Sequence, residues 1–305
     1  MIDQTRVIRR RRSAEFIHQF TKIHRGIHCK YFWVLSLGNG CVYDCAYCFL
    51  KITFRHQYDT KSKRLNMASF INKNDMERDL RFWLEHNGGS LILNAGELSD
   101  SLITDDIDKN TKFLIPIFAQ QKKHCLLFVT KSDCIQNLLD LEPTNQVIIS
   151  FSINGLYATQ RFERNAPSLE QRMRAIDALL KRGWRVRVRI DPMIPYEDWK
   201  QDYRYLCIKL NNLQVQPERI TIGSLRIFRI GLVKSPYYAD DDLKSFLVDH
   251  QDTDKRLRIA YALRKEMYQH MQAYLNKGKE VGICKEVTKL VKELEMSDNL
   301  CNCEP

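Results

Sequence analysis

No apolar run in this 305-residue sequence approaches the roughly 20 residues that a membrane-spanning helix needs. The N-terminus carries an aspartate and a basic run, and the apolar stretch of a secretory signal is missing behind them. A cytoplasmic location is therefore expected. In a reducing compartment, the ten cysteines indicate metal ligation or free thiols rather than disulfides.

The sequence is strongly basic, with a net charge of +11 and a pI near 9.1. Such a charge attracts polyanions, among which nucleic acid is the first candidate. The densest basic cluster comprises Arg6, Arg9, Arg10, Arg11 and Arg12. Two interpretations of this cluster stay open, phosphate contact or a solvated arm, and we expect residues 1–30 to form a basic N-terminal arm.

Internal repeats and low-complexity linkers are absent, and from residue 31 to residue 225 short apolar runs alternate with amphipathic ones. The apolar runs predict strands at Tyr31–Leu37, Ser90–Asn94, Cys125–Thr130, Val147–Ile153, Arg185–Ile190 and Arg219–Ser224. Helices are predicted at Asp75–Glu85, Asp106–Gln120 and Ser168–Arg182. The last helix has a capping box formed by Ser168 and Gln171, and Gly183 marks its end.

Six strands alternating with helices favour an α/β fold of parallel βα units, as a partial barrel or an open doubly wound sheet. No Gly-x-Gly-x-x-Gly motif follows a strand, so a dinucleotide-binding fold has no support. Residues 226–305 differ in pattern from this main domain. They predict a helical C-terminal extension with a long helix over Asp254–Lys277, a short one over Glu286–Leu294 and a cysteine-rich tail.

The strongest chemical motif follows the first predicted strand, where Cys41, Cys45 and Cys48 stand in a Cys-x-x-x-Cys-x-x-Cys pattern. Three thiolates at this spacing suit three corners of a [4Fe–4S] cluster and leave the fourth iron open for a ligand with an amine and a carboxylate. Gly38 and Gly40 allow a tight turn beside it. A structural zinc site is the alternative, but it wants four ligands and no second Cys-x-x-Cys pair lies nearby.

This motif, with Tyr47 before the last cysteine, resembles the signature of the radical S-adenosylmethionine (SAM) superfamily. Together with Ser99-Asp100, Phe128–Lys131 and Phe151–Asn154, the stretch from Gly40 to Leu50 resembles the spore photoproduct lyase family over about residues 31–225. The resemblance implies a partial (β/α)6 barrel with the [4Fe–4S] cluster after its first strand. It also implies reductive cleavage of SAM to a 5′-deoxyadenosyl radical, which takes hydrogen from the substrate.

By the family's pattern, Ser99, Lys131 and Ser152 contact the bound SAM. The residues agree in kind, because each stands at or just beyond the carboxyl end of a predicted strand, where barrels place their sites. A lysine suits a carboxylate and a serine suits a ribose hydroxyl. Taken singly, Lys131 also fits a solvated loop end, Ser99 a helix cap and Ser152 an ordinary strand residue.

The sequence departs from the family where hydrogen is returned to the product. The family's donor cysteine falls at Glu97 here, and Phe49 replaces a relay tyrosine, although Tyr47 remains. We therefore expect a paralogue that lacks the hydrogen-donor cysteine and acts on another substrate. Glu97 is a candidate for binding an amine or donor group, with helix capping as the alternative. Asp191 ends the fifth strand and faces the same cavity or forms a turn before proline.

Three further cysteines near the C-terminus, Cys284, Cys301 and Cys303, could ligate an auxiliary iron–sulfur cluster or another metal, or remain free thiols. The remaining cysteines are interpreted as ordinary core or surface residues: Cys29, Cys125, Cys134 and Cys207.

The leading hypothesis is thus a radical SAM enzyme acting on a nucleic acid or nucleotide, served by a flavodoxin- or ferredoxin-type electron donor. One alternative is a radical SAM enzyme for a peptide or small metabolite. Another is a non-enzymatic zinc protein that binds nucleic acid.

Overall fold

The structure is a computed structural model of the whole chain, and it describes residues 4–229, 241–248, 254, 256–275, 280–296 and 300–305. Its centre is an eight-stranded sheet with strand order β19-β15-β14-β12-β11-β10-β4-β2. Six of these strands match the predicted ones: β4 (Phe32–Leu35), β10 (Ile92–Asn94), β11 (Cys125–Thr130), β12 (Val147–Ser152), β14 (Arg185–Met193) and β15 (Arg219–Ser224). Within the described residues the edge strands β19 and β2 do not pair, so the predicted partial barrel is confirmed as an open one.

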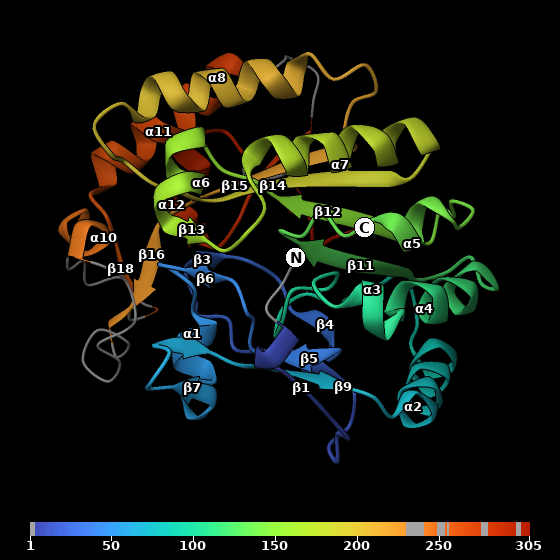
Figure 1. Cartoon of the computed structure of the whole chain (residues 1–305). Coiled ribbons are helices and arrows are strands. Elements are labelled where there is room, and N and C mark those ends of the chain that lie inside the picture. The colour runs from blue at the N-terminus through green and yellow to red at the C-terminus, as the bar shows by residue number, and fades with distance from the viewer. Residues whose placement is uncertain (1–3, 230–240, 249–253, 255, 276–279, 297–299) are drawn as a thin grey trace.

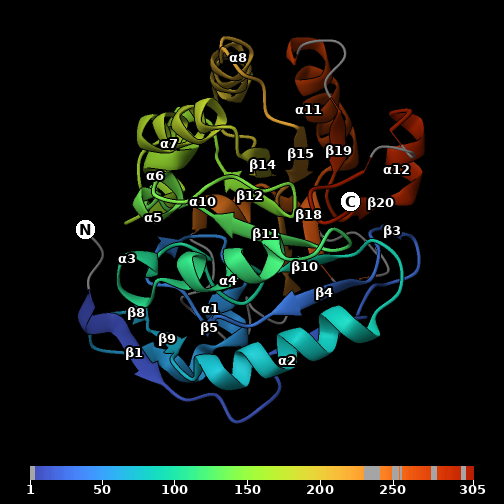
Figure 2. The ribbon, with the colours of Figure 1, turned by 90° about the vertical axis from the view of Figure 1, so that its right-hand side faces the viewer.

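Neighbours among these six strands are all parallel, and helices cover the outer side of the sheet (Figures 1 and 2). The helices are α1 (Leu50–Thr53), α2 (Lys73–His86), α3 (Asp105–Asp108), α4 (Asn110–Ala119), α5 (Gln136–Leu139), α6 (Leu156–Phe162), α7 (Leu169–Arg182), α8 (Trp199–Asn211), α10 (Asp241–Ser245), α11 (Tyr261–Tyr274) and α12 (Thr288–Glu293), with 3-10 turns η1 (Gln4–Arg6) and η2 (Arg55–Gln57). Each of these helices is too short or too polar to cross a membrane.

The remaining strands are short: β1 (Val7–Arg10), β2 (Ile17–Phe20), β3 (Ile27–His28), β5 (Gly38–Asn39), β6 (Asp44–Cys45), β7 (Tyr58–Asp59), β8 (Arg64–Leu65), β9 (Met67–Phe70), β13 (Glu163–Arg164), β16 (Arg226–Phe228), β17 (Leu247–Val248), β18 (Arg256–Ile259), β19 (Val281–Ile283) and β20 (Glu286–Val287). Strands β2 and β19 extend the main sheet at its two edges, and the others form separate sheets of two or three strands.

Local signals explain how two helices begin and end. Helix α7 has the predicted capping box, since Ser168 and Gln171 bond each other's backbone N–H groups, and Gly183 ends it at a φ of +93°. The helix predicted over Asp106–Gln120 is broken at Lys109, whose φ is +51°. The break occurs because the Asp105 carboxylate accepts from the backbone N–H of Thr111 at 2.8 Å and so caps a new helix.

Residues 4–30 do not form a separate arm. Strand β2 pairs antiparallel with β4, β1 pairs parallel with β9, and β3 pairs with β20 near the other end of the chain. Phe16 and Ile17 anchor the segment in the hydrophobic core. Within the basic cluster, Arg6 is buried and donates to the carbonyl of Val42 at 2.9 Å, whereas Arg11 is exposed beside Asp75.

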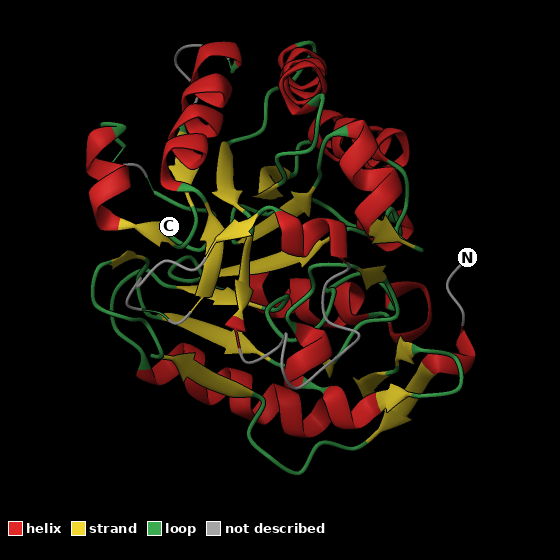
Figure 3. Ribbon diagram, turned by 90° about the vertical axis from the view of Figure 1, so that its left-hand side faces the viewer, coloured by secondary structure: helices red, strands yellow, loops and turns green. Residues whose placement is uncertain are grey.

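The C-terminal extension is less helical than its pattern predicts. In the described part of the long predicted helix, Arg256–Ile259 forms strand β18, which pairs antiparallel with β16 and β17, and α11 begins only at Tyr261. Apolar residues alternate with arginines in β18, and Ile259 is buried, which is the period of a strand. This small sheet lies on the side of the molecule seen in Figure 3.

The tail of residues 300–305 packs on the face of the main sheet opposite the helices. Ile149 and Phe151 of β12 point into the core beneath the helices, whereas Ser150 between them accepts a hydrogen bond from Asn302 at 2.9 Å. Asn302 also donates to the carbonyl of Val188 and is fully buried. A side chain at Gly282 would strike the carbonyl oxygen of Leu300 at 1.9 Å, so this glycine admits the tail.

Candidate active site

The three motif cysteines lie on one loop at the carboxyl end of β4. Cys41 follows Gly40, which has a φ of +82° and whose side-chain position would lie 2.6 Å from the carbonyl oxygen of Asn66. Cys45 lies in β6, which pairs antiparallel with β13, and Cys48 precedes helix α1. The loop is thus held by backbone pairing on one side and by a glycine-dependent turn on the other.

All three thiols line one cavity of about 480 Å³. Burial raises the pKa of each of them, of Cys41 well above its ordinary value and of Cys45 to about 12. A buried thiolate therefore needs a bound cation, as iron would supply. Three soft ligands on one loop, facing one hollow, fit the open [4Fe–4S] cluster that their spacing predicts.

The predicted SAM contacts line the same cavity: Ser99, Lys131 and Ser152. Ser99 Oγ is buried and has no hydrogen-bond partner among the described residues, which leaves it available to a ligand. Asp100 explains how the two loops are joined, because its carboxylate accepts from the Thr130 hydroxyl at 2.7 Å and from the backbone N–H of Lys131 at 2.6 Å. These hydrogen bonds fix the position of Ser99 and Asp100 relative to Lys131.

A cluster of buried charged side chains stabilises the loop of residues 41–48. Tyr47 donates a hydrogen bond to Glu163, whose carboxylate lies 2.5 Å from Arg172 and 3.9 Å from Lys131. Burial opposes ionisation of Glu163, but Arg172 and Lys131 prevail and lower its pKa. Neither Glu163 nor Arg172 was predicted as a site residue from the sequence. Arg172 could have been found, since it lies on the buried face of α7 with Leu169 and would need an acidic partner.

Glu97 also lines the cavity, where its carboxylate lies 3.6 Å from the ammonium of Lys285. It lies in a loop after β10, and its partner comes from the C-terminal extension. Burial opposes the charge of Lys285, but Glu97 and two thiols raise its pKa. Glu97 therefore faces an amine of the protein itself.

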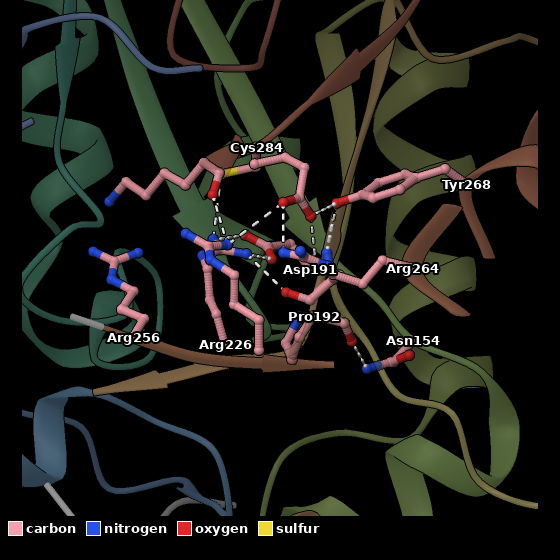
Figure 4. A network of polar contacts seen from close by, with 12 residues as sticks. Asn154, Asp191, Pro192, Arg226, Arg256, Arg264, Tyr268 and Cys284 are labelled. Atoms are coloured by element: carbon pink, nitrogen blue, oxygen red, sulfur yellow. Dashed lines mark hydrogen bonds and ion pairs between the residues drawn. The ribbon is translucent and has the colours of Figure 1, made fainter. Parts of the chain in front are cut away.

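Asp191 lies in the cavity wall as predicted and pairs with Arg226 through two hydrogen bonds, of 2.7 and 2.9 Å (Figure 4). Burial opposes ionisation, but Arg226 lowers the pKa of Asp191 to about 2. Gly223 makes room for the pair, because a side chain there would lie 2.4 Å from the carboxylate. Arg226 also lies 3.6 Å from the sulfur of Cys284.

Of the other C-terminal cysteines, Cys301 and Cys303 are hydrogen-bonded to each other, and Cys303 accepts from Arg189 at 3.2 Å. Within the described residues, no three His, Cys, Asp or Glu side chains surround a point that a single metal ion could occupy. The same is true of Cys41, Cys45 and Cys48.

Comparison with known proteins points to one family. The sequence profile described as spore photoproduct lyase matches residues 28–225. Spore photoproduct lyases of Bacillus subtilis (strain 168) and Clostridium acetobutylicum are 26% and 25% identical to 59% and 58% of this chain, respectively. The chain spans about half the length of these relatives, 51% of each.

Solved structures share the fold. A spore photoproduct lyase variant with dinucleoside spore photoproduct has a TM-score of 0.74 at 17% identity, covering 91% of this chain and 82% of its own. A variant with bound AdoMet and the same dinucleoside has a TM-score of 0.72 at 18% identity, covering 90% of this chain and 81% of its own. Streptococcus suis SuiB bound to S-adenosylmethionine has a TM-score of 0.51 at 14% identity, covering 85% of this chain and 51% of its own. Because the family profile matches well over half of the sequence, this chain belongs to the spore photoproduct lyase family, within the radical SAM superfamily.

Proposed function

We propose that this protein is a radical SAM enzyme in which Cys41, Cys45 and Cys48 hold a [4Fe–4S] cluster for the reductive cleavage of SAM. One observation carries the proposal: the three thiols line the same cavity as the residues that the family pattern assigns to SAM, at the carboxyl ends of parallel strands. When bound, the cluster and SAM supply the 5′-deoxyadenosyl radical that abstracts hydrogen from the substrate.

The protein's own residues bind and orient. Lys131 offers an ammonium group to the carboxylate of SAM, and Ser99 and Ser152 offer hydroxyls to its ribose. Asp100 holds the backbone of Lys131, and Glu163 accepts a hydrogen bond from Tyr47, which lies in the loop that carries the three cysteines. The AdoMet-bound spore photoproduct lyase variant and SAM-bound SuiB, which share the fold, support a SAM site here.

We place a nucleotide or nucleic acid in the rest of the cavity. Basic side chains outnumber carboxylates in its lining, with Lys22, Lys131, Arg189, Arg226, Arg256 and Lys285 against Glu97, Asp100 and Asp191. Such a lining attracts phosphate, as does the net charge of +11. The related lyase structures contain a dinucleoside photoproduct. A peptide or small-metabolite substrate is the alternative, and it predicts that DNA has no effect on turnover.

The net reaction differs from spore photoproduct repair, because a carboxylate stands where the family has its donor thiol. The O–H bond of a carboxylic acid is too strong to replace a thiol in hydrogen return. Glu97 is instead paired with Lys285, and this pair forms one end of the substrate cavity. A flavodoxin- or ferredoxin-type protein of the cytoplasm would supply the electron.

The test is anaerobic reconstitution and reduction of the full chain with SAM, followed by mass analysis of 5′-deoxyadenosine with and without single- and double-stranded DNA. Formation of 5′-deoxyadenosine that rises with DNA supports both parts of the proposal. Formation that ignores DNA supports the chemistry and rejects the substrate class. Its absence from protein with a full cluster rejects the chemistry.

A further inference from the structure

A second, smaller pocket adjoins the active-site cavity, and four cysteines line it: Cys29, Cys284, Cys301 and Cys303. The two hollows share a wall made of Glu97, Arg189, Cys284 and Lys285. The spacing of cysteines in the sequence gives Cys29 no partner, because it lies far from the other three along the chain. The fold supplies the missing fourth thiol.

Three chain segments meet at this pocket, and each is held in place. Strand β3 pairs antiparallel with β20, which sets Cys29 beside the segment that carries Cys284. Strand β19 joins the edge of the main sheet and ends at Ile283, and the backbone N–H of Cys284 continues the ladder to Ile222 at 2.9 Å. The tail brings Cys301 and Cys303, because Asn302 between them is fully buried against β12 and β14.

The surroundings favour a negatively charged group. Arg189 donates to Cys303 at 3.2 Å, and its Nε is buried without a hydrogen-bond partner among the described residues. Lys285 interacts electrostatically with Cys29 and Cys284. Besides the Glu97 carboxylate that pairs with Lys285, negative charge on the thiols would stabilise these two buried cations. Four thiolates around a metal cluster would carry that charge, and the cations would act as its outer shell.

We propose that Cys29, Cys284, Cys301 and Cys303 together hold a second [4Fe–4S] cluster, closed by four thiolates. The site is separate from the open cluster site of residues 41–48 and does not depend on the proposed SAM chemistry. Because each iron has a protein ligand, such a cluster exchanges electrons and binds no substrate.

A single zinc ion is the alternative occupant, because four thiolates also make a closed zinc site. Zinc would draw the four sulfurs to about 2.3 Å from one point. In a cubane each thiolate binds a different iron, so the sulfurs stand farther apart than around one ion. The pocket adjoins the cavity of the proposed open cluster, which favours iron, and the iron and sulfide content distinguishes the two metals.

The experiment counts metal in the full chain after the first site is removed. We expect the triple variant Cys41→Ala, Cys45→Ala, Cys48→Ala, purified and reconstituted without oxygen, to retain about four irons and four sulfides per chain, against about eight of each in the wild type. In that background, Cys29→Ala or Cys303→Ala should lower the iron content at least fourfold. The matched control Cys134→Ala, outside both pockets, should leave it unchanged.

Three results would overturn the proposal. The first is a folded triple variant, by circular dichroism, that holds no iron. The second is one equivalent of zinc in place of iron and sulfide. The third is full iron content after Cys29→Ala. Should a triple variant fail to fold, the wild type decides, since about four irons in the fully reconstituted chain also rejects a second cluster.

Discussion

The guanidinium of Arg172 lies 2.5 Å from the carboxylate of Glu163, and both side chains are buried. Arg172 comes from helix α7, whereas Glu163 begins the short strand that pairs with the cluster loop. Glu163 also accepts from Tyr47, so this ion pair connects the helical layer to the predicted iron ligands. This buried ion pair thus stabilises the loop that carries the predicted iron ligands.

Removing one partner of this buried pair should be costly. We expect Arg172→Met to lower the free energy of unfolding by about 3–5 kcal/mol, because Glu163 keeps a buried charge with its nearest partner gone. The control on the same helix is Lys181→Met, whose exposed pair with Asp177 should contribute less than about 1 kcal/mol. Urea unfolding followed by circular dichroism measures both, and equal losses in the two variants would contradict the prediction.

Each of the substitutions Cys41→Ala, Cys45→Ala and Cys48→Ala should abolish 5′-deoxyadenosine formation, since a cubane with two protein thiolates is not held in place. The measurement is mass analysis after reconstitution of each variant, with Cys134→Ala as the control. Native turnover in any one of the three would refute the assignment of the open cluster site.

Lys131→Met should weaken SAM binding by roughly tenfold to a hundredfold, the usual worth of a hydrogen bond to a charged group. Equilibrium binding of SAM to the reconstituted protein measures the change. Lys181→Met is the matched control, because it removes a lysine on α7 whose ammonium is paired with Asp177. Unchanged affinity in Lys131→Met would mean that the carboxylate is bound elsewhere.

We propose that Glu97 stands at the position of the family's donor thiol, so spore photoproduct should not be repaired efficiently. We expect reduced enzyme with dinucleoside spore photoproduct to form 5′-deoxyadenosine in excess over repaired thymine dinucleoside. Chromatography of both products gives the ratio. Clean repair over many turnovers would show that another group, such as Tyr47, donates hydrogen.

Stability should fall in acid partly through Glu218. Burial opposes its ionisation, but hydrogen bonds from Arg185 at 2.6 Å and Arg187 at 3.0 Å lower its pKa from 4.5 to about 2. Because the folded pKa lies below the unfolded one, its contribution is complete above pH 4.5 and is lost as the pH falls toward 2. Glu218→Gln should therefore unfold at lower urea than wild type at pH 7, with a gap that narrows at pH 3. An unchanged gap would contradict this assignment.

Local patterns predicted the barrel strands because β11 and β12 are largely apolar runs and β14 alternates arginine with apolar residues, signals that need no distant partner. The capping box of α7 is local in the same way. The sequence predicted a helix over strand β18 because Leu257 and Ala260 fit the start of the α11 pattern. The pairing of β18 with β16, which makes it a strand, is non-local.

The candidate site likewise contains residues that the local sequence predicts and residues that only the fold brings together. Cys41, Cys45 and Cys48 can be predicted as one site from the sequence, because one short loop carries all three. Glu163 cannot be predicted in this way, because its partner Tyr47 lies more than a hundred residues away along the chain. Cys29 cannot be predicted either, because the other cysteines that line its pocket lie near the far end of the chain. The same limit applied to residues 1–30, where a dense basic run concealed the apolar anchors Phe16 and Ile17.

The docked tail also has a bearing on the order of events during maturation. Its contacts are with strands β12, β14 and β15, so it can settle only after these strands are assembled. Until then the inner face of the sheet, with Arg187, Arg189 and Ser150, stays open to water. The docking of Asn302 then buries Ser150 and Arg187 beneath the tail.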